Sequence, residues 1–454
     1  MDKINEMNFL NVSLPEDVRA YVYAGYSDKA KELIKLYLKR NITSLLKERL
    51  EYELVRLNML ESTYTYSFDE ALEKCKKNIE GFTEEEFRGL IDERYADWVF
   101  INGEMKLARR FFENMLKVNK SLKERLFEKD PYDKSEEIRK KTVEEIINND
   151  GKSFFIHVKT GLKVDIDETI KGNKIKVHLP IPKAAQQIKN INIIKTSHEV
   201  KKITPENHPS RTIYFEEELK KNNEFTVEYS YENHIKYNNP EYDKVSDTQP
   251  KFYLNEDLPH VRFSPFLVSL AQEIIKDEKN PLRKARLIYD YITKNVQYSY
   301  MRPYAAIESI AEYCAYNLKG DCGVQAILFI TLCRIVGVPA RWQSGLYVTP
   351  YYIGCHDWAE FYIEPYGWLF ADPSFGGGAR RSNDTISWNF YFGNLDPFRM
   401  VANDYFQYPL YPEKKFLRND PYDNQIGEAE TEYMDLNRYA KSILEIIEVK
   451  EIQR

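Results

Sequence analysis

The stretch LKGDCGVQAILFITLCRIVGVPARW, residues 318–342, places a cysteine between glycines at the start of an apolar run. A structural cysteine usually lies within an apolar face, where it packs as a small hydrophobe. Cys322 instead follows a Gly-Asp pair and precedes a segment that is apolar at almost every position. This pattern predicts a buried helix that begins close to Cys322. The helix is expected to end at Gly337, because a glycine with a proline close behind it, here Pro339, is a typical helix C-terminus.

The position of Cys322 also favours chemistry at its sulfur. Asp321 can cap the helix, which would leave Cys322 in the first turn. Free backbone N–H groups and the positive end of the helix dipole stabilise a thiolate there. Gly320 and Gly323 leave room for a substrate carbonyl. Cys322 is therefore a candidate nucleophile, and a nearby histidine would activate it further.

A histidine and an aspartate follow at positions typical of a β-hairpin. The segment HDWAEFYIEPYGWLFAD, residues 356–372, contains a Pro-Tyr-Gly turn between two apolar arms. Directly opposed residues of a hairpin point the same way, so His356 and Asp372 share a face if the loop has an odd number of residues. A nucleophile, a base and an orienting carboxylate are thus available in the order Cys322, His356, Asp372.

The remaining cysteines have simpler interpretations. Three of the five are expected to be structural: Cys75, Cys314 and Cys333. Cys355 could form a zinc pair with Cys322, but no CxxC or HxxxH motif accompanies them, so we expect neither a metal site nor a cofactor. An odd number of cysteines, most of them in one short stretch, is not typical of a secreted disulfide framework. A reducing, cytoplasmic location is expected.

The composition indicates several domains without a nucleic-acid or membrane partner. The chain has 454 residues, against about 150 for a typical domain. It is 43% hydrophobic and 30% charged, which is sufficient for several cores. Its net charge of −6 is too balanced to attract nucleic acid. We identify no signal peptide and no apolar run of about 18 residues. Nothing in the sequence indicates an oligomeric state.

Hydrophobic periodicity divides the chain into four parts. Residues 1–148 have apolar residues at three- and four-residue spacing, which predicts an all-α domain. Residues 152–240 alternate apolar and polar positions, which predicts an antiparallel β-sandwich. Residues 248–412 mix both patterns and predict an α+β domain that contains the three candidate catalytic residues. Residues 413–454 are expected to form a C-terminal extension with a last helix.

The predicted α+β domain resembles the transglutaminase-like core. That family has a G-x-C motif, an apolar helix ending in G-[IV]-P-[AT]-R, an H-x-W-x-E motif, and then a Trp and a D-P pair. All of these elements occur within about residues 320–375. The segment YFGNLDPFRMVAND, residues 391–404, also resembles the strand that follows in bacterial members. The resemblance implies a papain-like fold, and a preceding β-domain is a common companion of such cores.

The resemblance also implies roles for individual residues. Cys322 would attack an amide carbonyl, His356 would carry protons, and Asp372 would orient the imidazole. The backbone N–H of Cys322 and an upstream donor would hold the oxyanion. The candidates for this donor and for substrate contacts are Gln297, Tyr298, Tyr300 and Trp358.

Three related families fit less well. The histidine of papain lies roughly 130 residues beyond its cysteine, whereas here the two are 34 residues apart. Arylamine N-acetyltransferases have an Arg-Gly-Gly run before the cysteine, and peptide N-glycanases have paired CxxC motifs. Neither feature occurs in this sequence. The expected fold is therefore a multidomain chain with a papain-like α+β transglutaminase core, preceded by a β-sandwich domain and an N-terminal all-α domain.

Three functions are compatible with these residues. The first is a cysteine protease or amidase that hydrolyses a peptide or protein through a thioester acyl-enzyme. The second is acyl transfer from protein glutamine, as cross-linking or deamidation, and the third is a non-enzymatic scaffold that retains the fold. The short Cys–His spacing resembles bacterial members of the protease type, so hydrolysis is favoured. Most aromatic residues near His356 are expected to belong to the core or the rim, and the rest would line a cleft for an extended peptide. Residues 374–381, SFGGGARR, would form its mobile lip.

Overall fold

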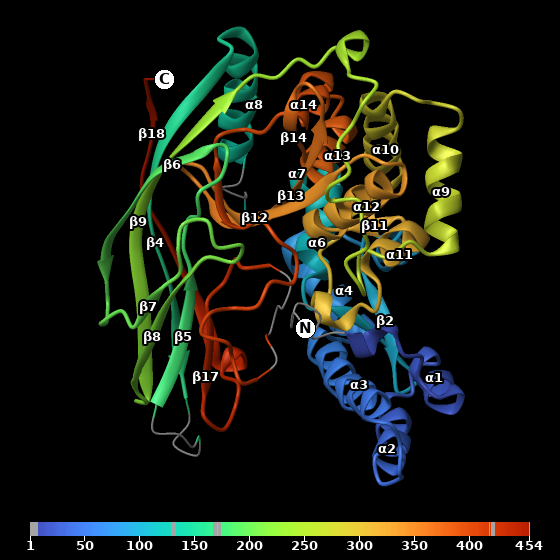
Figure 1. Cartoon of the computed structure of the whole chain (residues 1–454). Coiled ribbons are helices and arrows are strands. Elements are labelled where there is room, and N and C mark those ends of the chain that lie inside the picture. The colour runs from blue at the N-terminus through green and yellow to red at the C-terminus, as the bar shows by residue number, and fades with distance from the viewer. Residues whose placement is uncertain are drawn as a thin grey trace. The chain divides into compact units, whose positions relative to one another are not determined.

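The computed structural model describes residues 8–128, 133–166, 170, 174–416, 418 and 423–453. The chain has a mixed α/β architecture with several sheets and separates into two compact units (Figure 1). The first unit consists of Met1–Asp130, Asp257–Arg262 and Val296–Asp321. The second consists of Pro131–Glu256, Phe263–Asn295 and Cys322–Arg454.

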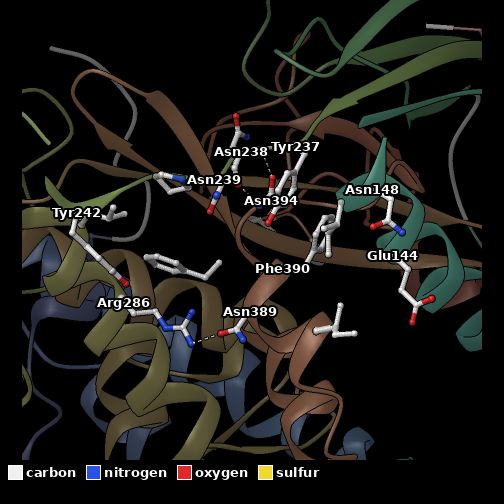
Figure 2. Close-up of a pocket in the computed structure, with 15 residues that line it drawn as sticks. Glu144, Asn148, Tyr237, Asn238, Asn239, Tyr242, Arg286, Asn389, Phe390 and Asn394 are labelled. Atoms are coloured by element: carbon white, nitrogen blue, oxygen red, sulfur yellow. Dashed lines mark hydrogen bonds between the residues drawn. The ribbon is translucent and has the colours of Figure 1, made fainter. Parts of the chain in front are cut away.

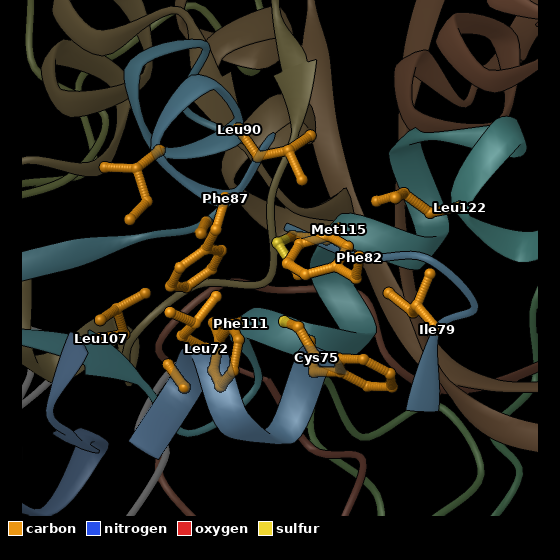
Figure 3. Packing of buried hydrophobic residues seen from close by; sticks show 14 residues of the cluster. Leu72, Cys75, Ile79, Phe82, Phe87, Leu90, Leu107, Phe111, Met115 and Leu122 are labelled. Carbon is orange, nitrogen blue, oxygen red and sulfur yellow. The ribbon is translucent and has the colours of Figure 1, made fainter. Parts of the chain in front are cut away.

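The first unit is mainly helical. Ser67 and Glu70 form a capping box at the start of α4 (Phe68–Asn78), and Thr83 caps α5 (Glu84–Asp92). Figure 3 shows the apolar core of these helices, in which Phe87, Phe111 and Met115 are fully buried. The helices of this unit are η2 (Asn8–Asn11), α1 (Glu16–Tyr23), α2 (Ser27–Tyr37), α3 (Ser44–Thr63), α4 (Phe68–Asn78), α5 (Glu84–Asp92), α6 (Phe111–Val118), α7 (Lys120–Glu124), η4 (Tyr304–Ala306) and α11 (Ile310–Asn317).

The expectation that the N-terminal part is all-α is wrong, because this part also contains a small sheet. Its strands, in the order β1-β3-β2, are β1 (Tyr64–Tyr66), β3 (Glu104–Ala108) and β2 (Trp98–Ile101). Asn102 and Gly103 both have positive φ, +51° and +87°, in the turn between β2 and β3. An Asn-Gly pair of this kind selects a tight hairpin, and this local signal overrides the helical spacing of the flanking residues.

Two antiparallel sheets, each of four strands among the described residues, follow in the second unit (Figure 1). The strand orders are β17-β5-β8-β7 and β18-β4-β9-β6. Alternating burial along β4 and β9 matches the alternating sequence pattern. The strands are β4 (Gly151–Asp165), β5 (Lys174–Pro180), β6 (Ile188–Thr196), β7 (Lys202–Ile203), β8 (Thr212–Glu218), β9 (Asn222–Lys236), β17 (Glu428–Thr431) and β18 (Ala440–Ile452).

The expected C-terminal helix is wrong, because the tail supplies the last strand of each of these sheets. β18 pairs with β4 and contains a bulge between Ile446 and Glu448. The extra residue breaks the two-residue alternation at this point, and partly buried positions lie at three-residue intervals, at Ile446, Val449 and Ile452. This spacing imitates a helix, although the β-branched residues favour a strand.

The second unit also contains an antiparallel sheet, which has five strands among the described residues. Their order is β15-β14-β13-β12-β16. Helix α12 packs against β13 and is buried at every position from Gly323 to Arg334. The elements of this region are α8 (Asp133–Asn148), η3 (Tyr242–Lys244), α9 (Pro265–Ile275), α10 (Pro281–Asn295), α12 (Cys322–Ile335), β12 (Ala340–Val348), β13 (Ile353–Ile363), β14 (Gly367–Ala371), α13 (Pro373–Arg381), α14 (Thr385–Phe390), β15 (Phe392–Gly393), β16 (Arg399–Asn403) and η5 (Asn437–Tyr439).

The part of the chain that the structure describes contains no helix long and apolar enough to cross a lipid bilayer.

Candidate active site

Cys322 is the first residue of α12 and is half-buried. Gly337 has a positive φ of +83° just beyond the helix, as its stop signal predicts. The helix therefore has the limits that the opening sequence indicates. Cys322 therefore lies at the N-terminal end of α12, where the backbone N–H groups have no hydrogen-bond acceptor within the helix.

The other cysteines differ from Cys322 in their surroundings. Burial raises the pKa of Cys75 to about 12 and also raises the pKa values of Cys314 and Cys333. All three side chains are buried, whereas Cys355 is exposed on β13. Burial in apolar surroundings disfavours the thiolate, so Cys75, Cys314 and Cys333 have the character of packing residues.

His356 and Asp372 lie within hydrogen-bond distance of each other, with 2.7 Å between His356 Nε2 and Asp372 Oδ2. The hairpin register explains this contact. Strand pairing ends at Ile363 and Gly367, so the loop contains three residues, an odd number. Asp372 follows the end of β14, diagonally across from His356 on the same face. The shared face predicted from the sequence is therefore present.

Asp372 is held from three directions in a fully buried position. It is the N-cap of α13, where its Oδ1 accepts a hydrogen bond from the backbone N–H of Phe375 (2.9 Å). Arg399 Nη1 donates to its Oδ2 at 2.9 Å. Burial alone would raise the pKa of Asp372, but the charges of His356 and Arg399 and these hydrogen bonds lower it to about 2. The carboxyl is therefore ionised at neutral pH.

Sequence reasoning missed Arg399 and its second partner, Asp396. Arg399 is fully buried on β16, and its Nη2 donates to Asp396 Oδ2 at 2.7 Å. The signal was present in the segment LDPFRMVAN, where one arginine interrupts an apolar strand. A buried cation requires anionic partners, and Asp372 and Asp396 are these partners.

Aromatic rings surround the imidazole of His356. The ring centroid of Phe375 lies 4.4 Å away, and that of Trp358 lies 6.1 Å away at an interplanar angle of 25°. Trp358 is fully buried, and its indole N–H donates to Gln343 Oε1 (2.8 Å). Trp358 therefore packs against His356, and its N–H is already hydrogen-bonded within the protein.

A second carboxylate, Asp357, contacts the candidate nucleophile. Cys322 Sγ lies 3.4 Å from Asp357 Oδ2 in donor geometry. Gln425 Nε2, from the C-terminal part of the chain, donates to Asp357 Oδ1 (2.5 Å) and to the backbone oxygen of His356 (3.0 Å). No sequence signal points to Gln425 at this place, because it lies 68 residues beyond Asp357.

The three upstream candidates for the oxyanion donor belong to the first unit. Gln297 and Tyr298 form β10, which pairs in parallel with β11 (Lys319–Gly320). Gln297 Nε2 is buried and has no hydrogen-bond partner among the described residues. The ring of Tyr300 lies under Arg110, 3.5 Å from the guanidinium carbon. Of these candidates, Gln297 has the unused donor that an oxyanion contact requires.

The expected mobile lip is wrong, because residues 374–381 lie within helix α13. The Asp-Pro pair explains the helix: Asp372 caps it and Pro373 occupies its first turn. A side-chain carbon at Gly376 would collide with the ring and hydroxyl of Tyr289. Gly376 therefore permits close packing of α13 against α10.

A separate cavity of about 610 Å³ lies between α8, α10, α14 and residues 237–242 (Figure 2). Its size falls within the range of ligand cavities. Figure 2 shows Arg286 bonded to Asn389 on one side and Glu144 and Asn148 on the other. The wall is fixed by Asn394, whose side chain accepts from the backbone N–H of Asn238 (2.7 Å) and donates to its oxygen (2.9 Å).

Within the described ranges, no group of three or more His, Cys, Asp or Glu side chains is arranged to hold a metal ion.

Comparison with known proteins finds the same family that the sequence motifs resemble. Residues 268–373 match the model of the transglutaminase-like superfamily, which confirms the family resemblance. An uncharacterized protein of Haemophilus influenzae is 25% identical over 186 residues, which cover 34% of this chain and 50% of that protein. This chain thus matches about half the length of that relative.

Two solved structures show a more distant likeness. A candidate cysteine protease from Cytophaga hutchinsonii has 16% identity and a TM-score of 0.44, covering 67% of this chain and 92% of its own. The periplasmic domain of TgpA from Pseudomonas aeruginosa has 12% identity and a TM-score of 0.28, covering 55% of this chain and 96% of its own.

Proposed function

We propose that this chain, whose residues 268–373 belong to the transglutaminase-like superfamily, is a cysteine-dependent amide hydrolase with Cys322, His356 and Asp372 as its catalytic residues. The observation that carries the proposal is the buried pair of His356 and Asp372, 2.7 Å apart, in the same compact unit as helix α12, which begins with Cys322. A buried imidazole–carboxylate pair near a helix-terminal cysteine is the arrangement that activates a thiol.

The reaction would proceed through a thioester. His356 takes the proton of Cys322, and the thiolate attacks the carbonyl carbon of an amide. The backbone N–H of Cys322 and one upstream donor, for which Gln297, Tyr298 and Tyr300 are the candidates, stabilise the oxyanion. The protonated imidazole then gives its proton to the leaving amine, and the thioester remains. Water, deprotonated by His356, hydrolyses the thioester and regenerates the thiol.

Asp372 would orient His356 and stabilise the imidazolium without taking its proton. Its pKa of about 2 supports this role, because the carboxyl stays ionised throughout the neutral range. Arg399 would fix the carboxylate, and Trp358 and Phe375 would fix the plane of the ring. We assign Trp358 to positioning, since its N–H is bonded to Gln343.

The substrate would be a peptide or a protein, and the reaction requires no cofactor. We retain the papain-like fold for the core, the preceding β-sandwich and helical domains, and a cytoplasmic location as proposals. The domain boundaries expected from the sequence, 1–148, 152–240, 248–412 and 413–454, also stay predictions.

The superfamily match supports acyl transfer from protein glutamine as a second candidate. Hydrolysis and transfer share every step as far as the thioester and differ in the nucleophile that resolves it. Adding a primary amine such as glycine ethyl ester separates them, because transfer gives the amide of the added amine and hydrolysis gives the acid.

Profiling on a library of casein peptides, with products identified by mass spectrometry, tests the proposal. We expect wild type to cleave amide bonds, Cys322→Ala to be inactive, and Asp372→Asn to lose roughly 10²–10⁴-fold in turnover while staying above background. Cys355→Ala is the matched control, because this cysteine is exposed and adjacent to His356, and it should retain activity. Turnover by Cys322→Ala at the wild-type rate would overturn the assignment.

A further inference from the structure

The sulfur of Cys322 lies beside a carboxylate that the proposed reaction does not use. Cys322 Sγ is 3.4 Å from Asp357 Oδ2, within hydrogen-bond reach for a thiol donor. Asp357 is buried, with 3% of its surface exposed. It directly follows His356 in β13. The two acidic residues of the site therefore differ: Asp372 contacts the imidazole and Asp357 contacts the thiol.

The C-terminal part of the chain holds Asp357 in place. Gln425 Nε2 donates to Asp357 Oδ1 and to the backbone oxygen of His356, which joins this segment to two consecutive residues of β13. The preceding residue, Asn424, donates through Nδ2 to the backbone oxygen of Arg211 (2.9 Å). Both side chains are at least nine-tenths buried. The segment is thus anchored at two consecutive residues, and the second of them contacts the carboxylate.

The groups that face Asp357 come from several elements. The thiol of Cys322 belongs to α12 and the carboxamide of Gln425 to the C-terminal segment. Ser344 on β12 is directly opposite Asp357 in the strand register, and its buried hydroxyl has no hydrogen-bond partner among the described residues. His356 is the titratable neighbour of Asp357 in β13.

A carboxylate next to sulfur favours the protonated form of the cysteine. The S–H group can donate to the carboxylate, whereas a thiolate at the same place would meet a like charge. We propose that Asp357, oriented by Gln425, restrains Cys322 as a hydrogen-bonded thiol in the resting protein. This inference rests on the proposed function in that Cys322 is the nucleophile. The C-terminal segment thereby sets the reactivity of a residue that lies about a hundred positions earlier in the chain.

The rate of alkylation of Cys322 by iodoacetamide, followed by peptide mass mapping between pH 5.5 and 9, tests the restraint without any substrate. We expect Asp357→Asn to raise the rate near pH 7 by about 3- to 10-fold and to move the midpoint of the pH profile downward. Gln425→Ala should change the rate in the same direction by a smaller factor. Asp372→Asn should lower it, because the imidazole loses its orienting partner.

Asp384→Asn is the matched control, since Asp384 caps α14 and should leave the alkylation rate of Cys322 unchanged. Circular dichroism identifies variants that fail to fold, and Gln425→Ala keeps the test available if Asp357→Asn is one of them. An unchanged or lower rate in folded Asp357→Asn, or in Gln425→Ala if only that variant folds, would overturn the restraint.

The restraint and the proposed function can fail separately. If alkylation responds as expected but no amide is cleaved, the restraint stands and the proposed function fails. If Cys322 is needed for cleavage but Asp357→Asn alkylates like wild type, only the restraint fails.

Discussion

Arg399 lies between two carboxylates in the interior of the protein, with Asp372 on one side and Asp396 on the other. All three side chains are fully buried. Arg399 has two tasks in this position, because it neutralises the buried anions and fixes the carboxylate that faces His356. Asp372, which contacts His356, is therefore held by the positive charge of Arg399 on the edge strand β16.

Replacing Arg399 by methionine should destabilise the protein strongly. The substitution leaves two buried carboxylates without their cation, which costs about 3–5 kcal/mol for a broken buried pair. Urea unfolding measures this loss. Arg399→Lys is the control that keeps the charge but not the two-pronged contact, and it should lose less. A loss below about 1 kcal/mol in Arg399→Met would contradict the account.

Asp372 should contribute to stability only in its ionised form. Burial opposes ionisation, but His356, Arg399 and the hydrogen bonds lower its pKa from 3.8 to about 2. Because the folded-state pKa lies below the unfolded one, the stabilisation is complete above about pH 4 and disappears as the pH falls toward 2. Urea titrations should show a steeper decline of unfolding free energy over this window in wild type than in Asp372→Asn. Equal slopes would show that the carboxylate is not stabilised by these contacts.

At the scale of the elements, Gly345 allows β16 to approach β12. Gly345 pairs with His356 on one side and with Val401 on the other. A side-chain carbon at Gly345 would collide with the backbone of Met400 and make a tight contact with the backbone of Ala402. The absence of a side chain at this one position therefore lets β16 bring Arg399 to Asp372.

Gly345→Ala should displace β16 and weaken both stability and activity. Overpacking of this kind costs about 1–3 kcal/mol, and the shift also moves Arg399 away from Asp372. Thermal unfolding and peptide cleavage measure the two effects. Gly378→Ala in α13 is the matched control, since a side-chain carbon there meets nothing within 4 Å. If Gly345→Ala and Gly378→Ala change stability and cleavage equally, the position of β16 does not depend on its close approach to β12 at Gly345.

The elements around Cys322 could be predicted from the sequence because their signals are local. The apolar run of α12, its glycine stop and the Pro-Tyr-Gly turn each lie within a few residues of the feature that they specify. The shared face of His356 and Asp372 was conditional on an odd number of residues in one loop, and the loop has three. These features depend on short-range backbone geometry, which a sequence pattern carries directly.

The features that could not be predicted depend on distant partners or on competing local signals. β18 is a strand because β4 lies beside it, and its bulge hides the strand period. Gln425 reaches Asp357, and Arg399 reaches Asp372, only in the folded chain. Residues 374–381 looked flexible because of three consecutive glycines, yet the cap at Asp372 makes them helical. Tertiary contacts override local propensity in these places.

At the scale of the whole molecule, the chain returns to its own earlier sheets. β17 and β18 complete the two sheets that begin with β5 and β4, and Gln425 precedes both strands. The C-terminal part is therefore integrated into the second unit. It contributes to the sheets and to the surroundings of Cys322.

Deleting residues 437–454 should destabilise the second unit, because the deletion removes β18. Strand β4 would then keep β9 on one side and become an exposed edge on the other. We expect the urea midpoint to fall by about 1 M, which corresponds to about 2 kcal/mol. Deleting only residues 453–454, beyond the end of β18, is the control and should leave the midpoint unchanged. An unaltered midpoint after the longer deletion would mean that β18 adds nothing to the sheet.

The most direct test of the central claim is the intact mass of the protein after acid quenching during turnover of a cleavable peptide. The account predicts a covalent acyl adduct that maps to the peptide containing Cys322 and that is missing in Cys322→Ala. An adduct on Cys355 in place of Cys322, or an equal adduct in Cys322→Ala, would contradict it.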